Sequence, residues 1–427
     1  MKNILCSILF LLSCICVSGW SNPVAKDDTV VMQKNQVRVI NLLQNDYDPD
    51  GGQMILYGLL NYNPTVDRDM FIIENTGDSS LKITTNYYYY GSFELKYRVY
   101  SKKNSTFYFD TAILHLTIEN IPKTKVEYID INNIRASVEP DGSLFWDRVT
   151  SVFEVPKGGG VNSIFSAALW IGGYDQGNDL RIAAQTYRQG ESFDFYPGPI
   201  ADQYDSAFMV KYNRVWKVDR GMIANHYANW NKGGYKADEN ILKWPGNGNT
   251  SNGEAALLAP FADLNSNGIY EPNSGEYPCI YGDQAIYFMF NDDGTHTETN
   301  ADSMRLEIHG MAYSFNSMGP LLNNSLFFRY RFINRSNDTF HDVYAGKWVD
   351  FDLGYAYDDY IGCDSAISAF YSYNGGNNDY YYGDNPPAVG LTFISDQMSH
   401  FVYYNNDWSL KGNPEDGADF YNYLSGR

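Results

Sequence analysis

The sequence predicts an all-β protein, with a two-sheet sandwich near its amino terminus and a larger, sandwich-like β-rich region after it. Aromatic residues make up 16% of the 427 residues, and tyrosine, which favours strands, is the most frequent of them. Short runs with period-two hydrophobicity recur along the chain and are separated by turn residues. Helical periodicity is scarce, and its best candidate is the short run 254–264.

The chain is strongly acidic, with a formal net charge of −20 and a sequence pI of about 4.6. Nucleic-acid binders need a basic surface, so the charge argues against nucleic acid as a partner. An acidic surface with oxygen-rich loops suits hard cations, or serves solubility alone. Beyond the amino terminus no apolar stretch is long enough to span a bilayer, so we expect no transmembrane segment in the mature chain.

The amino terminus has the three parts of a secretory signal peptide. Lys2 supplies a positive charge, residues 4–17 form an apolar run too short to span a membrane, and residues 17–19 are a small-residue cleavage site. We therefore expect residues 1–19 to be removed on export, which places the mature protein outside the cell or on its outer surface. A lipobox-like sequence ending at Cys14 is the alternative and would leave a lipid on that cysteine.

Only two cysteines, Cys279 and Cys363, lie outside this amino-terminal segment. In an oxidising compartment a pair of thiols predicts one disulfide, Cys279–Cys363. The pair is too widely spaced in the sequence for a zinc site.

Residues 22–120 are expected to form the first sandwich. Their β-rich runs include TVVMQ, QVRVINLL, DMFIIE, SLKITT, SFELKYRVYS and TAILHLTI. About seven such runs in a hundred residues fit an antiparallel sandwich.

Within this domain, NLLQNDYDPDGGQMIL places Asp46, Asp48 and Asp50 at alternate positions around a stiff proline turn. Three carboxylates on such a turn predict a Ca²⁺ site, although an Asx-turn without metal is the alternative. The motif, together with AKDD and the tyrosine-rich NYYYYGSFELKYRVYS, resembles bacterial cadherin-like and tandem Ig-like adhesin repeats. The resemblance implies an adhesive or spacer module. Gln53 departs from it, because an acidic residue is common there.

A linker at 121–127, marked by Pro122, precedes a β-rich region that runs from residue 128 to 427. This region resembles large surface and secreted proteins of bacteria with a type IX secretion system. The matching stretches include DINNIRASVEPDGSLFWD, FEVPKGGGVNSIFSAALWIGG, YGDQAIYFMFNDDGTHTET and AGKWVDFDLGYAYDDYIGCD. The resemblance implies an exported multidomain protein with a carboxyl-terminal sorting domain. The chain ends at Arg427 without one, so we expect the natural protein to continue.

The stretch DLNSNGIYEPNSGEYP, which begins at Asp263, resembles dockerin and thrombospondin-type calcium loops. Side-chain oxygens alternate at Asp263, Asn265 and Asn267, and the carbonyl of Ile269 is the seventh ligand position. The twelfth position is not acidic, so either Glu271 or Glu276 is expected to complete the site. We predict a structural Ca²⁺ ion at 263–276, because no pair of flanking helices suggests a sensor.

A second acidic stretch, VDFDLGYAYDD, combines carboxylates with aromatic rings. Its members are Asp350, Asp352, Asp358 and Asp359, flanked by Trp348, Tyr355, Tyr357 and Tyr360. Such a combination is typical of a sugar-binding cleft, and two close carboxyls are also what a glycosidase requires. The alternative, favoured on the sequence alone, is a further calcium-rich loop with core aromatics.

Two functions remain from the sequence. The leading expectation is a calcium-stabilised structural or adhesion protein of the cell surface, without catalytic residues in this segment. The alternative is an extracellular protein that binds or degrades glycans. The expected partners are cell-surface proteins or glycans.

Overall fold

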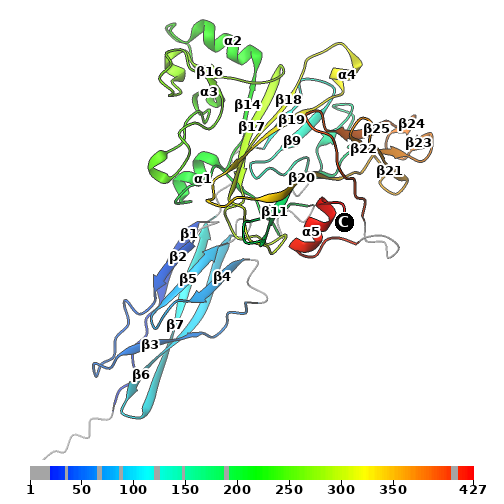
Figure 1. Cartoon of the computed structure of the whole chain (residues 1–427). Coiled ribbons are helices and arrows are strands. Elements are labelled where there is room, and N and C mark those ends of the chain that lie inside the picture. The colour runs from blue at the N-terminus through cyan, green and yellow to red at the C-terminus, as the bar shows by residue number, and fades with distance from the viewer. Residues whose placement is uncertain are drawn as a thin grey trace, which may run out of the picture. The chain divides into compact units, whose positions relative to one another are not determined.

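The computed structural model describes residues 20–33, 37–64, 70–85, 90–119, 126–146, 150–186, 192–404 and 412–427. Strands dominate these residues, which confirms the predicted all-β class. The chain divides into two compact units, one ending at Glu119 and the other beginning at Asn120 (Figure 1). Residues 1–19, including Cys14, and most of the expected linker lie outside the described residues. No helix in the described parts of the chain is long and apolar enough to cross a membrane.

The first unit is a sandwich of two sheets. One sheet has the order β1-β7-β6-β3 and the other β2-β5-β4. β1 runs parallel to β7, and the other pairs are antiparallel. The strands are β1 (Asp28–Gln33), β2 (Val37–Asn41), β3 (Met54–Leu59), β4 (Phe71–Asn75), β5 (Ser80–Thr85), β6 (Gly91–Lys103) and β7 (Thr106–Glu119).

Period-two patterning explains why these segments pair as strands. On β6 the side chains of Leu95, Tyr97 and Val99 are buried, whereas the residues between them face outward or are only half-buried. They join buried side chains of β7, including Leu114 and Leu116, in one apolar core. Alternation of this kind requires an extended backbone with one face on a core.

The second unit contains most of the strands. They are β8 (Glu127–Ile129), β9 (Arg135–Val138), β10 (Phe153–Glu154), β11 (Ser166–Tyr174), β12 (Leu180–Ala183), β13 (Tyr196–Pro197), β14 (Trp216–Asp219), β15 (Phe261–Ala262), β16 (Tyr277–Pro278), β17 (Gln284–Asn291), β18 (Leu306–Ser314), β19 (Phe327–Asn334), β20 (His341–Asp350), β21 (Asp359–Asp364), β22 (Ala369–Asn374), β23 (Asn378–Asp379), β24 (Gly383–Asp384) and β25 (Ala388–Thr392).

Two of its sheets enclose the main core. One has the order β12-β11-β20, and the other is β13-β17-β18-β19 with β14 also paired to β17. Leu169 of β11, Phe288 and Phe290 of β17 and Ile308 of β18 belong to the same buried cluster. β17 and β18 are buried along almost their whole length, as expected for central strands. A smaller sheet, β21-β22-β25, and the ribbon β23-β24 form a separate projection of this unit (Figure 1).

The helices lie where the sequence did not predict them. They are α1 (Ser206–Tyr212), α2 (Arg220–Asn229), α3 (Glu239–Leu242), α4 (Pro320–Asn323) and α5 (Gly417–Leu424), with 3₁₀ turns η2 (Thr250–Asn252) and η3 (Pro272–Ser274). The predicted helix at 254–264 is wrong. Leu258 and Ala259 donate their N–H groups to the carbonyls of Gly246 and Pro245, so these groups are not available for helical bonds. Of the ten residues of α2 only His226 is buried, so no apolar stripe marks this helix in the sequence.

A fully buried charged histidine joins the loops beside the two large sheets. His296 lies 2.8 Å from the carbonyl oxygen of Ile182 through Nδ1 and 2.9 Å from that of Asp292 through Nε2. Carbonyl oxygens only accept hydrogen bonds, so both ring nitrogens donate and the ring is an imidazolium. The carboxylates of Asp194 and Asp292 each lie 3.8 Å from the ring. Burial alone lowers the pKa of His296, but the two carboxylates and the two carbonyls raise it above its ordinary value.

We predict that this buried charge makes the second unit less stable as the pH rises. The stabilisation is complete below the ordinary histidine pKa, near 6.5, and is lost as the pH rises through the raised folded-state value. His296→Leu should lower the free energy of unfolding by roughly 3 kcal/mol at pH 6, because two buried carboxylates lose their counter-charge. Urea unfolding between pH 5.5 and 8.5 measures this, with the exposed His341→Gln as control. An unchanged pH dependence in His296→Leu contradicts the assignment.

Candidate functional sites

The oxygen-rich loop, residues 263–276, is closed at its base by the ribbon β15-β16. Its tight path depends on two left-handed residues, Ser266 at φ 61° and Gly268 at φ 75°. Asp263 accepts the N–H groups of Asn267 at 3.1 Å and Gly268 at 2.7 Å, one on each carboxylate oxygen. The alternating polar residues of the sequence therefore build a compact turn around the Asp263 carboxylate.

The side chains of three predicted ligands contact one another, with the amide nitrogens of both asparagines donating to Glu271. The Glu271 Oε2 atom lies 2.8 Å from Nδ2 of Asn265 and 2.7 Å from Nδ2 of Asn267. The carbonyl of Ile269 lies between these side chains in the sequence. Carboxylate, carboxamide and carbonyl oxygens in a small exposed loop have the chemistry that Ca²⁺ prefers.

Glu276 has a different role from the one that a metal ligand would have. Its side chain is buried, and its two oxygens accept the N–H of Leu264 at 3.0 Å and the N–H of Glu271 at 2.7 Å. It is thus an internal clamp that holds the two ends of the loop. Of the two acidic residues that the sequence offered, the geometry favours Glu271 as the metal ligand.

Asn247 was not predicted from the sequence, although it fixes the loop from outside. Its Oδ1 accepts the N–H of Tyr270 at 2.7 Å, and its Nδ2 donates to the carbonyl of Gly268 at 2.9 Å. It lies about twenty residues upstream of these partners, so nothing in the local spacing links it to the loop.

By chemical type the oxygens of Asp263, Asn265, Asn267, Ile269 and Glu271 suit a calcium ion. The carboxylate of Asp263 and the Oδ1 atoms of Asn265 and Asn267 accept backbone N–H groups within the loop, so these oxygens would have to turn from those bonds to hold it. An ion there would cross-link the turn electrostatically. Among the described residues, no group of three or more His, Cys, Asp or Glu side chains is arranged to hold a metal. The loop offers two such carboxylates, and the remaining oxygens are neutral.

The three aspartates of the first unit do not fit a calcium site, because a lysine occupies their centre. Lys103 Nζ lies 2.8 Å from Asp48 Oδ1 and 2.6 Å from Asp50 Oδ2, and the side chains of Lys103 and Asp48 are buried. Asp46 instead accepts the N–H of Lys26 at 2.8 Å. Burial would raise the pKa of Asp48, but hydrogen bonds led by that from Lys103 lower it to about 2.

The predicted disulfide is absent from the structure. Cys279 and Cys363 are both free thiols with exposed side chains. Cys279 follows β16, whereas Cys363 lies on β21 opposite Phe370 of β22, so the two belong to different sheets. The disulfide was predicted from the number of cysteines alone, and that number carries no information on the distance between them in the fold.

The acidic-aromatic stretch is divided by the fold. Trp348 lies on β20 and donates its indole N–H to the Tyr404 hydroxyl at 2.8 Å, so it belongs to the packing beside that strand. Tyr355 and Tyr357 lie on the loop before β21 and are 41% and 89% exposed. The tyrosines of the loop are therefore surface residues and not core aromatics.

Four of these surface rings form a tyrosine cluster, which we define as Tyr355, Tyr357, Tyr380 and Tyr381. The ring of Tyr355 lies 5.4 Å from that of Tyr357, 6.0 Å from that of Tyr380 and 6.5 Å from that of Tyr381, between centroids. Tyr380 and Tyr381 are 78% and 58% exposed. Tyr380 and Tyr381 lie between β23 and β24, more than twenty residues beyond Tyr355, so the spacing of the acidic-aromatic stretch does not predict them.

Asp379 holds the two halves of the cluster together. Its buried carboxylate accepts the backbone N–H groups of Tyr355 at 2.9 Å and Tyr381 at 2.8 Å. Burial would raise the pKa of Asp379, but these hydrogen bonds lower it, so the group stays ionised. Gly354, at φ 72°, permits the close approach, because a Cβ there would lie 2.3 Å from the Asp379 Oδ1 atom.

Three aspartates of the acidic-aromatic stretch have raised pKa values. Burial raises the pKa of Asp350 to about 7, and the charge of Asp352 adds to this. Burial also raises the pKa of Asp352 to about 6 and that of Asp359 to about 6. The stability that their protonated forms contribute is present at low pH and is lost as the pH rises towards neutrality.

Comparisons with known proteins assign no family. No family model matches the chain, and no curated protein matches it. Among solved structures, one similar chain is a nucleoside hydrolase-related hypothetical protein from Saccharophagus degradans that is associated with carbohydrate metabolism. It is 11% identical over 24% of this chain, with a TM-score of 0.19, and the match spans about a quarter (26%) of that protein. A likeness this low supports no inference about function.

We predict that Lys103, and not a metal ion, balances the charges of Asp48 and Asp50 in the first unit. Lys103→Met should lower the melting temperature of this unit by several degrees, because it leaves the buried Asp48 carboxylate without its positive partner. Lys82→Met, which breaks the exposed pair between Lys82 and Glu74, should change it little. Calorimetry in the presence and absence of Ca²⁺ checks both variants. A wild-type first unit that melts higher in Ca²⁺ contradicts the role given to Lys103.

Proposed function

We propose that this chain is a non-catalytic binding protein of the cell exterior, which adheres to glycans through the tyrosine cluster of its second unit. The observation that carries the proposal is the exposure of four neighbouring tyrosines, which the buried carboxylate of Asp379 holds together. Tyrosine offers a flat apolar face and a hydroxyl at low cost in conformational entropy, which suits recognition of hydroxyl-rich rings. Export is proposed from the signal-like amino terminus and from the resemblance to bacterial surface proteins.

Binding fits the carboxylates better than hydrolysis does. A glycosidase needs one ionised and one protonated carboxyl that both face the substrate. Asp379 is ionised, but its oxygens accept backbone N–H groups inside the loop.

We predict that the tyrosine cluster carries glycan affinity. Tyr357→Ala and Tyr380→Ala should each weaken binding about tenfold, because each removes an exposed ring from the contact. Binding of the full chain to a printed array of bacterial and plant polysaccharides, followed by titration of the best ligand, measures this. Tyr281→Ala, which removes a 43% exposed ring outside the cluster, is the matched control. Equal affinity of all three variants, or no binding to any polysaccharide, contradicts the proposal.

We further propose that Ca²⁺ stabilises the second unit through the oxygen-rich loop, which is the site whose donor oxygens fit the ion. The ion would bind only the folded loop, so stability should rise with its concentration. We expect one Ca²⁺ per chain and a melting temperature several degrees higher in excess Ca²⁺ than in chelator.

Metal analysis and calorimetry of Asp263→Asn and Asp48→Asn distinguish the two predicted calcium sites. Asp263→Asn should lose the ion and the thermal shift. Asp48→Asn should keep both, since Lys103 occupies its site. Loss of calcium in Asp48→Asn, or a calcium-loaded Asp263→Asn, refutes the assignment to the oxygen-rich loop.

A further inference from the structure

The projection formed by β21-β22-β25 and β23-β24 is acidic and lacks basic side chains (Figure 1). Residues 351–392, which the structure describes throughout, contain no Lys, Arg or His. They contain six aspartates, which are Asp352, Asp358, Asp359, Asp364, Asp379 and Asp384. Among the described residues, no basic side chain from elsewhere in the chain forms an ion pair with any of the six. An uncompensated negative surface of this kind attracts a cationic partner.

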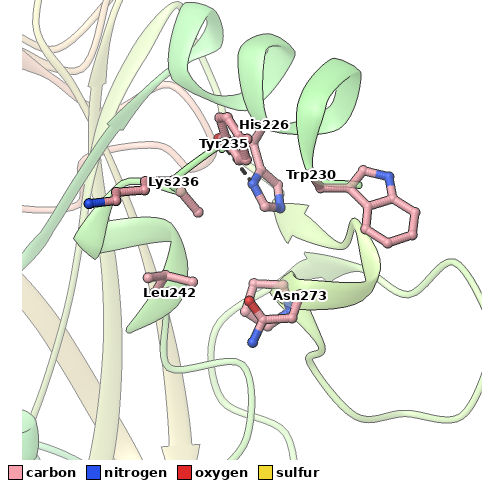
Figure 2. A pocket seen from close by; sticks show the side chains of 8 residues that line it. His226, Trp230, Tyr235, Lys236, Leu242 and Asn273 are labelled. Carbon is pink, nitrogen blue, oxygen red and sulfur yellow. Dashed lines mark hydrogen bonds between the residues drawn. The ribbon is translucent and has the colours of Figure 1, made fainter. Parts of the chain in front are cut away.

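Basic side chains gather elsewhere in the second unit. Residues 206–243, which include α1, α2 and α3, carry seven of them: Lys211, Arg214, Lys217, Arg220, Lys232, Lys236 and Lys243. Figure 2 shows Lys236 at the pocket between α2, α3 and η3, with its ammonium directed away from the open space. The pocket therefore offers no charge to a ligand, whereas the projection has an excess of one sign.

The aspartates of the projection lie around the tyrosine cluster. Asp379 bonds to the backbone of both halves of the cluster, and Asp358 directly follows Tyr357 in the sequence. The pKa of Asp359 is raised to about 6, chiefly by burial, and the charges of Asp358 and Asp379 add to the increase. These carboxylates are therefore close enough to repel one another, and a bound cation would relieve the repulsion.

The rings of the tyrosine cluster are inclined to one another, so their faces point in different directions. The planes of Tyr380 and Tyr381 are at 88°, and Tyr355 makes angles of 52° with Tyr357 and 51° with Tyr380. The face of a tyrosine ring attracts a cation that lies within about 6 Å of its centroid. The same face packs against the CH groups of a sugar ring. A positively charged sugar uses both properties of one side chain.

Three further tyrosines on the outer face of the small sheet favour a polymer over a single sugar. Tyr360 of β21 pairs with Tyr373 of β22, and Tyr371 lies two residues before Tyr373 on the same face. The ring of Tyr373 lies 5.9 Å from that of Tyr360 and 6.1 Å from that of Tyr371, between centroids. Tyr371 lies across Gly362, where a Cβ would lie 2.8 Å from its ring. Such a row of rings suits successive residues of an extended chain.

We propose that the glycan bound at the tyrosine cluster is a polymer with protonated amines, such as one built from glucosamine. This inference rests on the proposed glycan function and names the substrate class within it. The aspartates attract the amines, and the tyrosine rings pack against the sugar faces. Among the described residues no three carboxylates are arranged to hold a metal, so the charge of the projection suits amines spread along a chain better than a compact metal ion.

Calorimetric titration of the full chain with three hexasaccharides tests the substrate class. Oligomers of glucosamine, N-acetylglucosamine and glucose, all β-1,4-linked, share one backbone and differ only in the substituent on C2. At a pH where the amines are protonated, the glucosamine oligomer should bind at least tenfold more tightly than the other two. High salt should remove most of this advantage, because exposed charges are screened.

Variants that remove charge from the projection test its source. Asp364→Asn combined with Asp384→Asn removes two exposed charges and keeps the oxygens that accept the Ala366 N–H and the Asn378 amide. This pair should weaken the glucosamine oligomer about fivefold and leave the neutral oligomers unchanged. The matched control combines Asp302→Asn with Asp342→Asn, which removes two charges outside residues 351–392 from side chains that are 81% and 68% exposed. It should bind all three oligomers as the wild type does.

The outcomes separate this inference from the proposed function. Equal binding of the three oligomers overturns the amine preference but leaves glycan binding at the cluster intact. No binding of any oligomer or polysaccharide contradicts both. Equal weakening by the control pair assigns the preference to the net charge of the chain and also overturns it. A lysine hexapeptide that binds as tightly as the glucosamine oligomer, with no loss in Tyr357→Ala, assigns the surface to basic peptides instead.

Discussion

Buried carboxylates that accept backbone N–H groups are the interaction on which the loops of this protein depend. Glu276 closes the oxygen-rich loop, and Asp379 joins the two halves of the tyrosine cluster. Asp292 accepts the N–H groups of Met304 at 2.7 Å and Leu306 at 2.6 Å, and it also flanks the buried imidazolium. An ionised carboxylate binds N–H groups strongly in a buried setting, so one side chain orders a long segment without regular structure. The acidic composition is therefore partly structural, and not only a solvated surface.

The strands of the first unit could be predicted from the sequence because one face of each is buried. SFELKYRVYS and TAILHLTI show the alternation that the structure places on β6 and β7. α2 could not be predicted, since its helix is capped by Asp219 but buries little apolar surface. The run at 254–264 has helical composition, yet distant backbone carbonyls take its N–H groups. Hydrophobic periodicity therefore predicted neither segment correctly, because α2 lacks an apolar stripe and the 254–264 run bonds to a distant part of the chain.

The candidate sites, too, could be predicted only in part from local sequence spacing. Alternating Asp and Asn residues marked both predicted calcium sites, but local spacing cannot show which cation reaches the carboxylates. On the first site the ammonium of Lys103, more than fifty residues away in the sequence, occupies the centre. On the second, Glu276 is withdrawn into the loop and Glu271 remains near the amides. The acidic-aromatic composition of the sequence indicated the exposed Tyr355 and Tyr357. It did not indicate Tyr380 and Tyr381, which lie between β23 and β24 and complete the tyrosine cluster.

The central claim is that internal carboxylates, rather than bound calcium, fold the loops that carry the candidate sites. Hydrogen exchange of the full chain in chelator tests it most directly. The account predicts that the amides of Tyr355 and Tyr381, which bond to Asp379, stay protected without calcium, as do those of Leu264 and Glu271. Rapid exchange of these amides in chelator, with protection restored by Ca²⁺, would contradict the claim and make the ion the organiser of both loops.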